Sequence, residues 1–322
     1  MLFQKRPKLR STLIWILWVF VVQFLLGNIS AAFYAYKFTH FFEKPGEWNV
    51  SQPKNIFDKT WKLFKGPEFG KNIDEPLPDF PFKHLKFTTA NGNKIDAWYS
   101  GVAVPRGTIC LFHGLTANKS YYLSEANVFR AMGFNVVLLD FRGHGKSDGM
   151  KTTIGYNESE EVKLVYDFLK SRGEKRIFLF GGSMGAVTIA RAVSIYGLNP
   201  SGIILEMPFN SLLDHIKARG RSFGFPQTIF AVPVTCWIGI ENSFGVFTHK
   251  TSVYARNINC PVLLQWGTKD HLVTLEETSV IFTNLASKNK KLVVYEEGTH
   301  SSFLHQDSTK WKKEVQLFLD LN

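Results

Sequence analysis

The stretch that decides the fold is Ile177-Phe178-Leu179-Phe180-Gly181-Gly182-Ser183-Met184-Gly185-Ala186. Its apolar first half predicts a buried β-strand, and the small residues after Ser183 predict a helix that packs closely on its neighbours. Glycines two positions before and two positions after the serine let the backbone turn sharply. A G-x-S-x-G turn of this kind exposes the serine hydroxyl, which is typical of a catalytic nucleophile. A glycine-rich turn without chemistry can share the motif, but the flanking strand and helix favour Ser183 as the nucleophile.

A serine hydroxyl needs a base within hydrogen-bonding reach, and that base needs an acid to orient it. His300 is the predicted base, because it follows the last predicted strand at the sheet edge where Ser183 lies. His305, a few residues further on, is the alternative base. Asp270 is the predicted acid, since it follows the preceding buried strand, and Glu206 is the alternative acid. The chain order of serine, aspartate and histidine is the one expected for a nucleophile on this type of turn.

Two backbone N–H groups, those of Leu115 and Met184, are the predicted oxyanion donors. Met184 begins the helix after the nucleophile, where free N–H groups favour negative charge. Leu115 lies in the loop that follows the third predicted strand, at the same edge of the sheet. We expect His113 to brace this loop by hydrogen bonding, and we expect the later loop 140–147 to be structural.

Strand and helix signals alternate after Pro81. The first two predicted strands alternate polar and apolar residues and are joined by Asn91-Gly92, a strong hairpin signal. The later strands are short apolar runs, as expected when helices cover both faces of a sheet. A hairpin followed by repeated strand–helix units predicts an α/β fold with a mostly parallel eight-stranded sheet flanked by helices. The predicted strands are Leu85–Thr89, Lys94–Tyr99, Thr108–Phe112, Asn135–Asp140, Ile177–Phe180, Gly202–Glu206, Val262–Trp266 and Lys291–Tyr295.

One long interval, residues 207–259, interrupts the alternation. It is too long for a simple crossover and is rich in phenylalanine. We therefore expect an inserted helical lid over the carboxyl edge of the sheet, where open α/β sheets bind ligands. After it, Thr274 and Glu277 have capping-box spacing at the start of a helix. A last helix is predicted at about 306–319.

The N-terminus predicts a membrane anchor. Basic residues within 1–10 precede an uncharged, strongly apolar stretch at 11–36, and about 20 residues of helix span a bilayer. The basic flank is expected in the cytoplasm, which places the catalytic domain on the extracytoplasmic side of a single-pass protein. A cleaved signal peptide, with small residues at 30–32, is the alternative. The aromatic segment 33–42 is typical of a membrane-interface belt and favours the uncleaved anchor.

Composition limits the remaining choices. The formal net charge is +11, but Lys and Arg are scattered and do not alternate with stacking aromatics. A basic surface near a membrane is therefore expected, and nucleic acid is not an expected partner. Residues 37–81 form a proline-rich juxtamembrane segment predicted to carry no chemistry, and residues 82–322 form the predicted catalytic domain. The three cysteines give no even disulfide framework, and the sequence leaves the oligomeric state open.

Five motifs occur in order: HGLTANK at 113–119, DFRGHGKS at 140–147, GGSMGA at 181–186, GTKDH at 267–271 and EGTH at 297–300. With them, residues 82–322 resemble the α/β-hydrolase superfamily, and within it the serine aminopeptidase and monoacylglycerol-lipase-like hydrolases. The first motif is similar to that of bacterial carboxylesterases. The resemblance implies a Ser-His-Asp triad and no metal or organic cofactor. Serine at the turn, in place of aspartate, argues against the dehalogenase and epoxide-hydrolase branches. The N-terminal segment lies outside the common core of the family.

The predicted activity is that of a carboxylesterase- or lipase-like serine hydrolase acting through an acyl-enzyme. Its expected substrate is a small-molecule ester with an apolar or lipid-like acyl group. A peptidase or an acyl-thioesterase would use the same triad, because the triad does not select the leaving group. A membrane-tethered binding protein without turnover is the alternative from another class.

Overall fold

The computed structural model has one central sheet of eight strands, and all eight predicted strands belong to it. Their bounds are β3 (Lys83–Thr88), β4 (Lys94–Ser100), β5 (Thr108–Phe112), β6 (Asn135–Leu139), β7 (Ile177–Gly182), β8 (Gly202–Glu206), β9 (Val262–Gly267) and β10 (Lys290–Tyr295). The order across the sheet is β10-β9-β8-β7-β5-β6-β4-β3. β4 pairs antiparallel with both β3 and β6, and every other pair is parallel. The mostly parallel eight-stranded sheet is therefore confirmed.

The structure describes most of the chain. The described residues are 6–43, 55, 57–58, 61, 66–222 and 227–322. The predicted basic flank is thus described only from Arg6, and the proline-rich segment only in parts. No statement about the fold below extends to the other residues.

Helices cover both faces of the sheet because its central strands are apolar on both sides. Every residue of β5, β6, β7 and β8 is buried. Along β7, Leu179 belongs to one hydrophobic cluster and Phe180 to the other, since successive side chains of a strand point to opposite faces. The first cluster lies under α4 (Ser159–Ser171), α5 (Met184–Tyr196), α8 (Thr251–Ala255) and α9 (Leu275–Asn284). The second lies under α3 (Leu123–Ala131), α10 (Phe303–Gln306) and α11 (Ser308–Leu321).

Two predicted helices can be compared in detail. The capping box at the start of α9 is confirmed, since the Thr274 hydroxyl accepts from the Glu277 N–H and the Glu277 carboxylate accepts from the Thr274 N–H. The last helix, predicted at about 306–319, is confirmed as α11 (Ser308–Leu321), whereas the separate short helix α10 before it was not predicted. The chain ends α10 at Gln306 and begins α11 at Ser308, because the Asp307 side chain accepts from the Lys310 N–H and caps the new helix.

The interval 207–259, called the insert below, is helical, as predicted. Its described residues form α6 (Leu212–Ser222), α7 (Gln227–Asn242), η2 (Val246–Thr248) and α8. α6 begins shortly after β8 ends at the carboxyl edge of the sheet, and it packs beside α7. Pro233 lies inside α7, where it removes one helical hydrogen bond.

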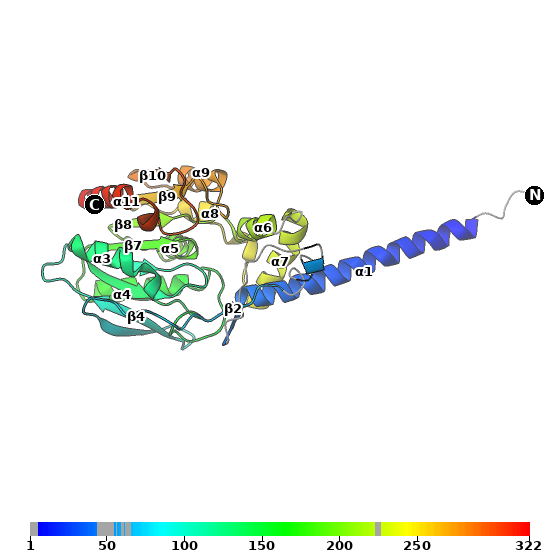
Figure 1. The fold of residues 1–322 in the computed structure, drawn as a ribbon, viewed down its shortest axis with the longest axis horizontal. Coiled ribbons are helices and arrows are strands. Elements are labelled where there is room, and N and C mark those ends of the chain that lie inside the picture. Colours follow the sequence, from blue (N-terminus) through cyan, green and yellow to red (C-terminus); the bar gives the residue numbers. More distant parts are fainter. Residues whose placement is uncertain (1–5, 44–54, 56, 59–60, 62–65, 223–226) are drawn as a thin grey trace, which may run out of the picture.

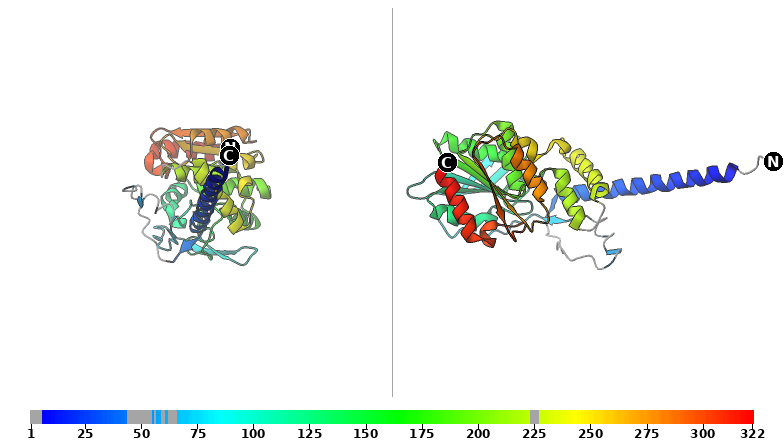
Figure 2. Two further views of the ribbon diagram at one scale, coloured as in Figure 1. Left: turned by 90° about the vertical axis from the view of Figure 1, so that its right-hand side faces the viewer. Right: turned by 90° about the horizontal axis from the view of Figure 1, so that it is seen from above.

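Helix α1 (Arg6–Thr39) is longer than the predicted anchor at both ends and projects from the domain (Figure 1). Its segment Ser11–Thr39 is long and apolar enough to cross a membrane. The right-hand view of Figure 2 shows its last turns alongside the yellow-green helices of the insert. The interface belt predicted at 33–42 is only partly right: Phe33 and Tyr36 are exposed, but Tyr34 and Phe38 are buried in the domain. After α1, β1 (Phe41–Phe42) pairs with β2 (Phe69–Gly70).

Candidate active site

Ser183 lies between β7 and α5 with φ 51° and ψ −118°, a conformation that L-residues rarely adopt. Such strain costs about 1–3 kcal/mol and persists only where neighbouring contacts hold it. The Ser183 N–H donates to the Glu206 carbonyl at 2.9 Å. A side chain at Gly185 would meet the Phe112 carbonyl oxygen at 2.1 Å, so only glycine lets α5 start this close to β5. The predicted strand–turn–helix therefore holds the serine at the carboxyl edge of the sheet.

Three side chains form a continuous hydrogen-bonded chain at this edge. His300 Nε2 lies 3.0 Å from Ser183 Oγ, and His300 Nδ1 lies 2.7 Å from Asp270 Oδ2. The Asp270 side chain is fully buried, and the His300 side chain is 13% exposed. The other Asp270 oxygen accepts from the N–H groups of Leu272 and Val273. Both oxygens of the carboxylate are thus held by hydrogen bonds, one of them to the imidazole that the carboxylate orients.

The alternative acid and base have other surroundings. Glu206 Oε1 accepts from the Trp311 indole N–H at 2.7 Å. Burial, helped by the nearby Glu125 carboxyl, raises the pKa of Glu206 to about 8. Glu206 is therefore a neutral acid at pH 7 and is poorly suited to stabilise an imidazolium ion. His305 lies in the short α10, and the histidine that contacts Ser183 is His300.

The loops that carry Asp270 and His300 are joined to each other. The Lys269 N–H donates to the Gly298 carbonyl at 2.8 Å, and a side chain at Gly267 would meet the same oxygen at 2.3 Å. Gln306 braces the histidine loop from the other side, because its amide oxygen accepts from the Thr299 N–H at 2.6 Å. Sequence reasoning missed Gln306, whose role depends on the break between α10 and α11.

The two predicted oxyanion donors lie on elements that meet at Ser183. Met184 is the first residue of α5, so its N–H has no acceptor within the helix. The loop with Leu115 passes close by, since a side chain at Gly114 would lie 3.7 Å from Ser183 Cβ. Thr116 in this loop has φ 67°, a strained conformation that other contacts must hold.

His113 supplies one of these contacts. Its Nε2 accepts from the Phe141 N–H at 3.2 Å, which leaves the proton on Nδ1 to donate to the Gly114 carbonyl at 2.8 Å. Burial lowers the pKa of His113 to about 4, so the ring is neutral. The bracing role predicted for His113 is confirmed.

A buried ion cluster holds the end of the same loop. Lys119 Nζ lies 2.6 Å from Asp140 Oδ2, 2.9 Å from Asp96 Oδ2 and 2.5 Å from Glu75 Oε2. Burial opposes the charge on Lys119, but the Asp140 carboxylate and the other carboxylates raise the pKa of Lys119 above its ordinary value. The Lys119 ammonium is thus paired with three carboxylates, and these ion pairs hold the end of the loop in place.

The residues 69–81, called the strap below, cross over this loop. Asn118 Nδ2 donates to the carbonyls of Asn72 and Asp74 at 3.2 and 3.1 Å. Lys71 Nζ donates to the Ser147 and Gly149 carbonyls, and Glu75 belongs to the ion cluster. The proline-rich segment, from which no chemistry was expected, therefore positions the loop that carries a predicted oxyanion donor.

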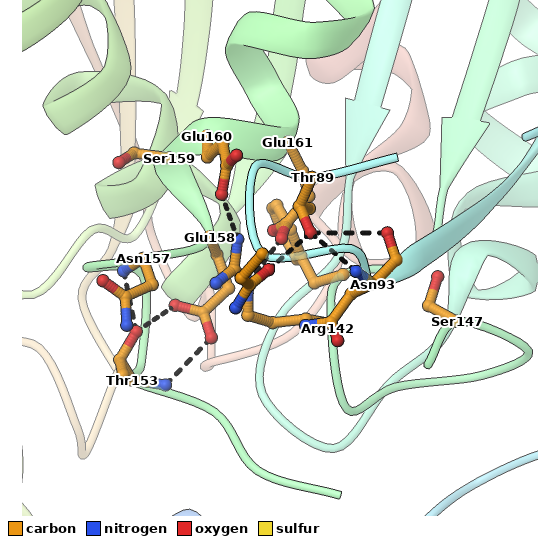
Figure 3. A network of polar contacts seen from close by, with 12 residues as sticks. Thr89, Asn93, Arg142, Ser147, Thr153, Asn157, Glu158, Ser159, Glu160 and Glu161 are labelled. Atoms are coloured by element: carbon orange, nitrogen blue, oxygen red, sulfur yellow. Dashed lines mark hydrogen bonds and ion pairs between the residues drawn. The ribbon is translucent and has the colours of Figure 1, made fainter. Parts of the chain in front are cut away.

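The loop 140–147 is structural, as predicted. Figure 3 shows the Arg142 guanidinium between two carboxylates of α4, with Nε 2.5 Å from Glu161 Oε1 and NH2 2.7 Å from Glu160 Oε2. Next to it, Glu158 accepts from the Thr153 N–H and hydroxyl at 2.9 and 2.7 Å. These charge-assisted bonds tie the loop after β6 to the first turn of α4.

Comparisons with known proteins agree with this fold. A family model described as serine aminopeptidase, S33, matches residues 103–221. The uncharacterized protein YqkD of Bacillus subtilis is 25% identical over 255 residues, 78% of this chain and 83% of that protein. The lysophosphatidylserine lipase ABHD12 of Danio rerio is 23% identical over 297 residues, 88% of this chain and 74% of that protein.

Two further similarities concern membranes and fold. The uncharacterized membrane protein YNL320W of Saccharomyces cerevisiae is 24% identical over 73% of this chain and 80% of that protein. The structure of the esterase Pf2001 of Pyrococcus furiosus matches with a TM-score of 0.64 and 25% identity, over 79% of this chain and 98% of that chain. The relatives named for an activity here are a lipase and an esterase, which indicates hydrolase activity. The sheet order, the serine turn and these similarities together show that the chain belongs to the α/β-hydrolase superfamily.

Proposed function

We propose that this protein is a membrane-anchored serine esterase that cleaves carboxylic esters of lipid-like acyl groups through an acyl-enzyme. The observation that carries the proposal is the chain of hydrogen bonds from Ser183 Oγ through His300 to a buried Asp270. A nucleophile, its base and an orienting acid in this order are the parts that acyl transfer requires.

The geometry supports a two-step reaction. Ser183 Oγ attacks the ester carbonyl while His300 Nε2 takes the hydroxyl proton, and Asp270 stabilises the imidazolium. The N–H groups of Leu115 and Met184 bind the oxyanion, and His300 then gives its proton to the departing alcohol oxygen. In the second step His300 takes a proton from water, whose oxygen attacks the acyl carbon. The acid leaves and the proton returns to Ser183.

Ester cleavage is favoured over amide cleavage by the named relatives, which are a lysophosphatidylserine lipase and an esterase. The apolar helix α1 favours an amphiphilic small-molecule substrate that resides in or at a bilayer. Peptide cleavage is a second candidate, because the matching family model is described as serine aminopeptidase. For topology we propose a cytoplasmic N-terminus and an extracytoplasmic catalytic domain, since the basic residues precede the apolar segment.

A fluorophosphonate probe tests the catalytic proposal on the full-length protein in detergent. Wild type should be labelled and Ser183→Ala should not, because the probe reacts with an activated serine. Equal labelling of the two, or none of wild type, would overturn the proposal in favour of a binding protein without turnover. Rates on a short-chain ester, a monoacylglycerol, a lysophospholipid, an acyl-thioester and a peptide amide then decide the substrate class. Protease added to intact cells should reach the catalytic domain if the proposed topology holds.

A further inference from the structure

The last turns of α1 pack on helix α7 of the insert. The buried residues Ala31, Tyr34, Ala35 and Phe38 recur at helical spacing and form one face of α1. The Tyr34 ring meets the Phe230 ring of α7 edge-on, with centroids 5.0 Å apart. Further along both helices, Asn242 Nδ2 donates to the Thr39 hydroxyl at 3.4 Å. α1 and α7 therefore run in the same direction, and the start of α7 is the end nearer the N-terminus of α1.

The length of α1 places the bilayer relative to this contact. Residues 11–27 are all exposed, and Ala31 is the first buried residue after Ser11. A helix rises 1.5 Å per residue, so about 20 residues cross a hydrocarbon core of about 30 Å. If the core begins at Ser11, just after the last basic residue, it ends near Ser30. With the hydrocarbon core placed there, the domain meets α1 at the level where the headgroup layer begins.

The adjoining ends of α6 and α7 lie at that level. Tyr34 is one turn beyond Ser30, or about 6 Å along the helix, within the headgroup layer. Phe230 contacts Tyr34, and a side chain at Gly220 would lie 3.1 Å from the Phe230 ring. The neighbouring Ile229 side chain is 77% exposed although it is apolar. Arg221 at the end of α6 brings a guanidinium group, which pairs well with phosphate.

The other end of α6 lies near the triad. His215, in the first turns of α6, is buried between Phe38 and Phe209, with ring centroids 5.9 and 4.9 Å away. α6 begins at Leu212, six residues after Glu206, whose backbone carbonyl accepts from the Ser183 N–H at 2.9 Å. Burial and the nearby Arg219 charge lower the pKa of His215. The 11 residues of α6, about 16 Å of helix, therefore connect the surroundings of the triad to the headgroup layer.

We propose that the adjoining ends of α6 and α7, with Arg221, Ile229 and Phe230, rest in the headgroup layer of the bilayer that α1 crosses, and that the substrate reaches Ser183 from this layer along the insert. The partner of this surface is the lipid bilayer. Continuity with α1 identifies it, because the helix that enters the membrane is packed against the same surface. The route of the substrate rests on the proposed esterase function, whereas the contact with lipid does not.

Fluorescence quenching tests the contact without any catalytic readout. An environment-sensitive fluorophore is attached at Ile229→Cys in the full chain, with the half-buried Cys236 replaced by serine, and the protein is reconstituted into phosphatidylcholine vesicles. The matched control is Leu321→Cys, because Leu321 is also apolar and is 71% exposed. It lies at the C-terminus, which Figure 1 shows at the opposite end of the molecule from the start of α1. Lipids with a nitroxide at the headgroup should quench residue 229 several-fold more than residue 321. Equal quenching at the two positions would overturn the proposal.

A kinetic comparison tests the route. Ile229→Glu and Leu321→Glu both change exposed side chains, so both variants should stay folded. The measured quantity is the rate on a long-chain monoacylglycerol in vesicles divided by the rate on a soluble short-chain ester. This ratio should fall several-fold for Ile229→Glu alone, and an unchanged ratio would contradict loading from the membrane. If neither ester is cleaved by wild type, the esterase proposal fails, while the quenching result still decides the lipid contact.

Discussion

At the scale of the residue, the site depends on a backbone that is strained and held from several sides. Ser183 adopts a positive φ, and its N–H is fixed by the Glu206 carbonyl. Asp270 is fixed by two backbone N–H groups before it contacts His300. The side chains of the proposed triad are thus held in place by the fold itself, and such preorganisation is the condition for electrostatic catalysis.

Replacing Asp270 with asparagine should lower kcat by about 10⁴-fold, because the amide no longer selects the tautomer of His300 that can accept the serine proton. The measurement is ester hydrolysis by the purified full-length protein. His305→Gln is the control, since this histidine competes with His300 in the sequence, and it should retain most of the activity. If His305→Gln were inactive and Asp270→Asn still active, His300 would not be the base and Asp270 would not be the acid.

Gly185→Ala should destabilise the protein by about 1–3 kcal/mol or more, because the added carbon would lie 2.1 Å from the Phe112 carbonyl oxygen and would push α5 away from β5. Gly27→Ala is the control, since a side chain at Gly27 meets nothing within 4 Å. Thermal unfolding of both variants gives the comparison. A wild-type Tm for Gly185→Ala would show that α5 does not need this close approach.

The neutral Glu206 should make stability depend on pH. Burial raises its pKa to about 8, so the folded protein keeps a proton that the unfolded chain releases near pH 4.5. Stability contributed by this group therefore falls as pH rises from about 4.5 to about 8. Glu206→Gln keeps an acceptor for Trp311 and removes the titration, so its stability relative to wild type should increase between pH 5 and pH 8. Urea unfolding midpoints of both proteins at pH 5 and pH 8 measure this difference. A midpoint that shifts equally in the two proteins between these pH values would contradict the prediction.

At the scale of the element, the strap and the ion cluster of Lys119 connect the segment that follows α1 to the loop with the proposed oxyanion donor Leu115. Glu75→Gln removes one of the three carboxylates around Lys119 and leaves Asp140 and Asp96 in place. We expect kcat to fall, by less than the roughly 10²-fold of losing an oxyanion donor, with little change in KM. Asp320→Asn, which breaks an exposed ion pair with Arg106, is the control. A change confined to KM would mean that the strap does not position the oxyanion loop.

The sequence predicted the strands and the triad because both follow local rules. A buried parallel strand is an apolar run between turn residues, and catalytic groups follow such runs at one edge of the sheet. The break at Asp307 was missed, because the apolar spacing of Trp311 and Val315 does not show which residue caps the helix. The strap was missed for another reason. Asn118 binds backbone carbonyls at Asn72 and Asp74, and carbonyls have no sequence signature.

At the scale of the whole molecule, the last turns of α1 are a structural part of the domain, in addition to the proposed role of α1 as an anchor. One face of its last turns is buried, and the exposed part precedes them. The sequence predicted the anchor but not this packing, because an aromatic segment beside an apolar helix suits both a membrane interface and a domain core. Whether the aromatic segment faces lipid or protein depends on where the insert packs against α1. The residues that make this contact lie about 200 positions further along the chain.

This packing predicts different outcomes for two truncations. Deleting residues 1–27 removes the exposed apolar part of α1 and keeps the turns that contact α7, so the protein should remain folded with a Tm close to that of the full chain. Deleting residues 1–43 also removes Tyr34, Ala35 and Phe38 and uncovers the apolar surfaces of α6 and α7. Losing buried side chains of this size costs several kcal/mol, roughly 3–5 for one phenylalanine alone. The shorter protein should therefore unfold at a much lower temperature or aggregate. Thermal unfolding in the same detergent compares the two, and equal Tm values would show that α1 is only a tether.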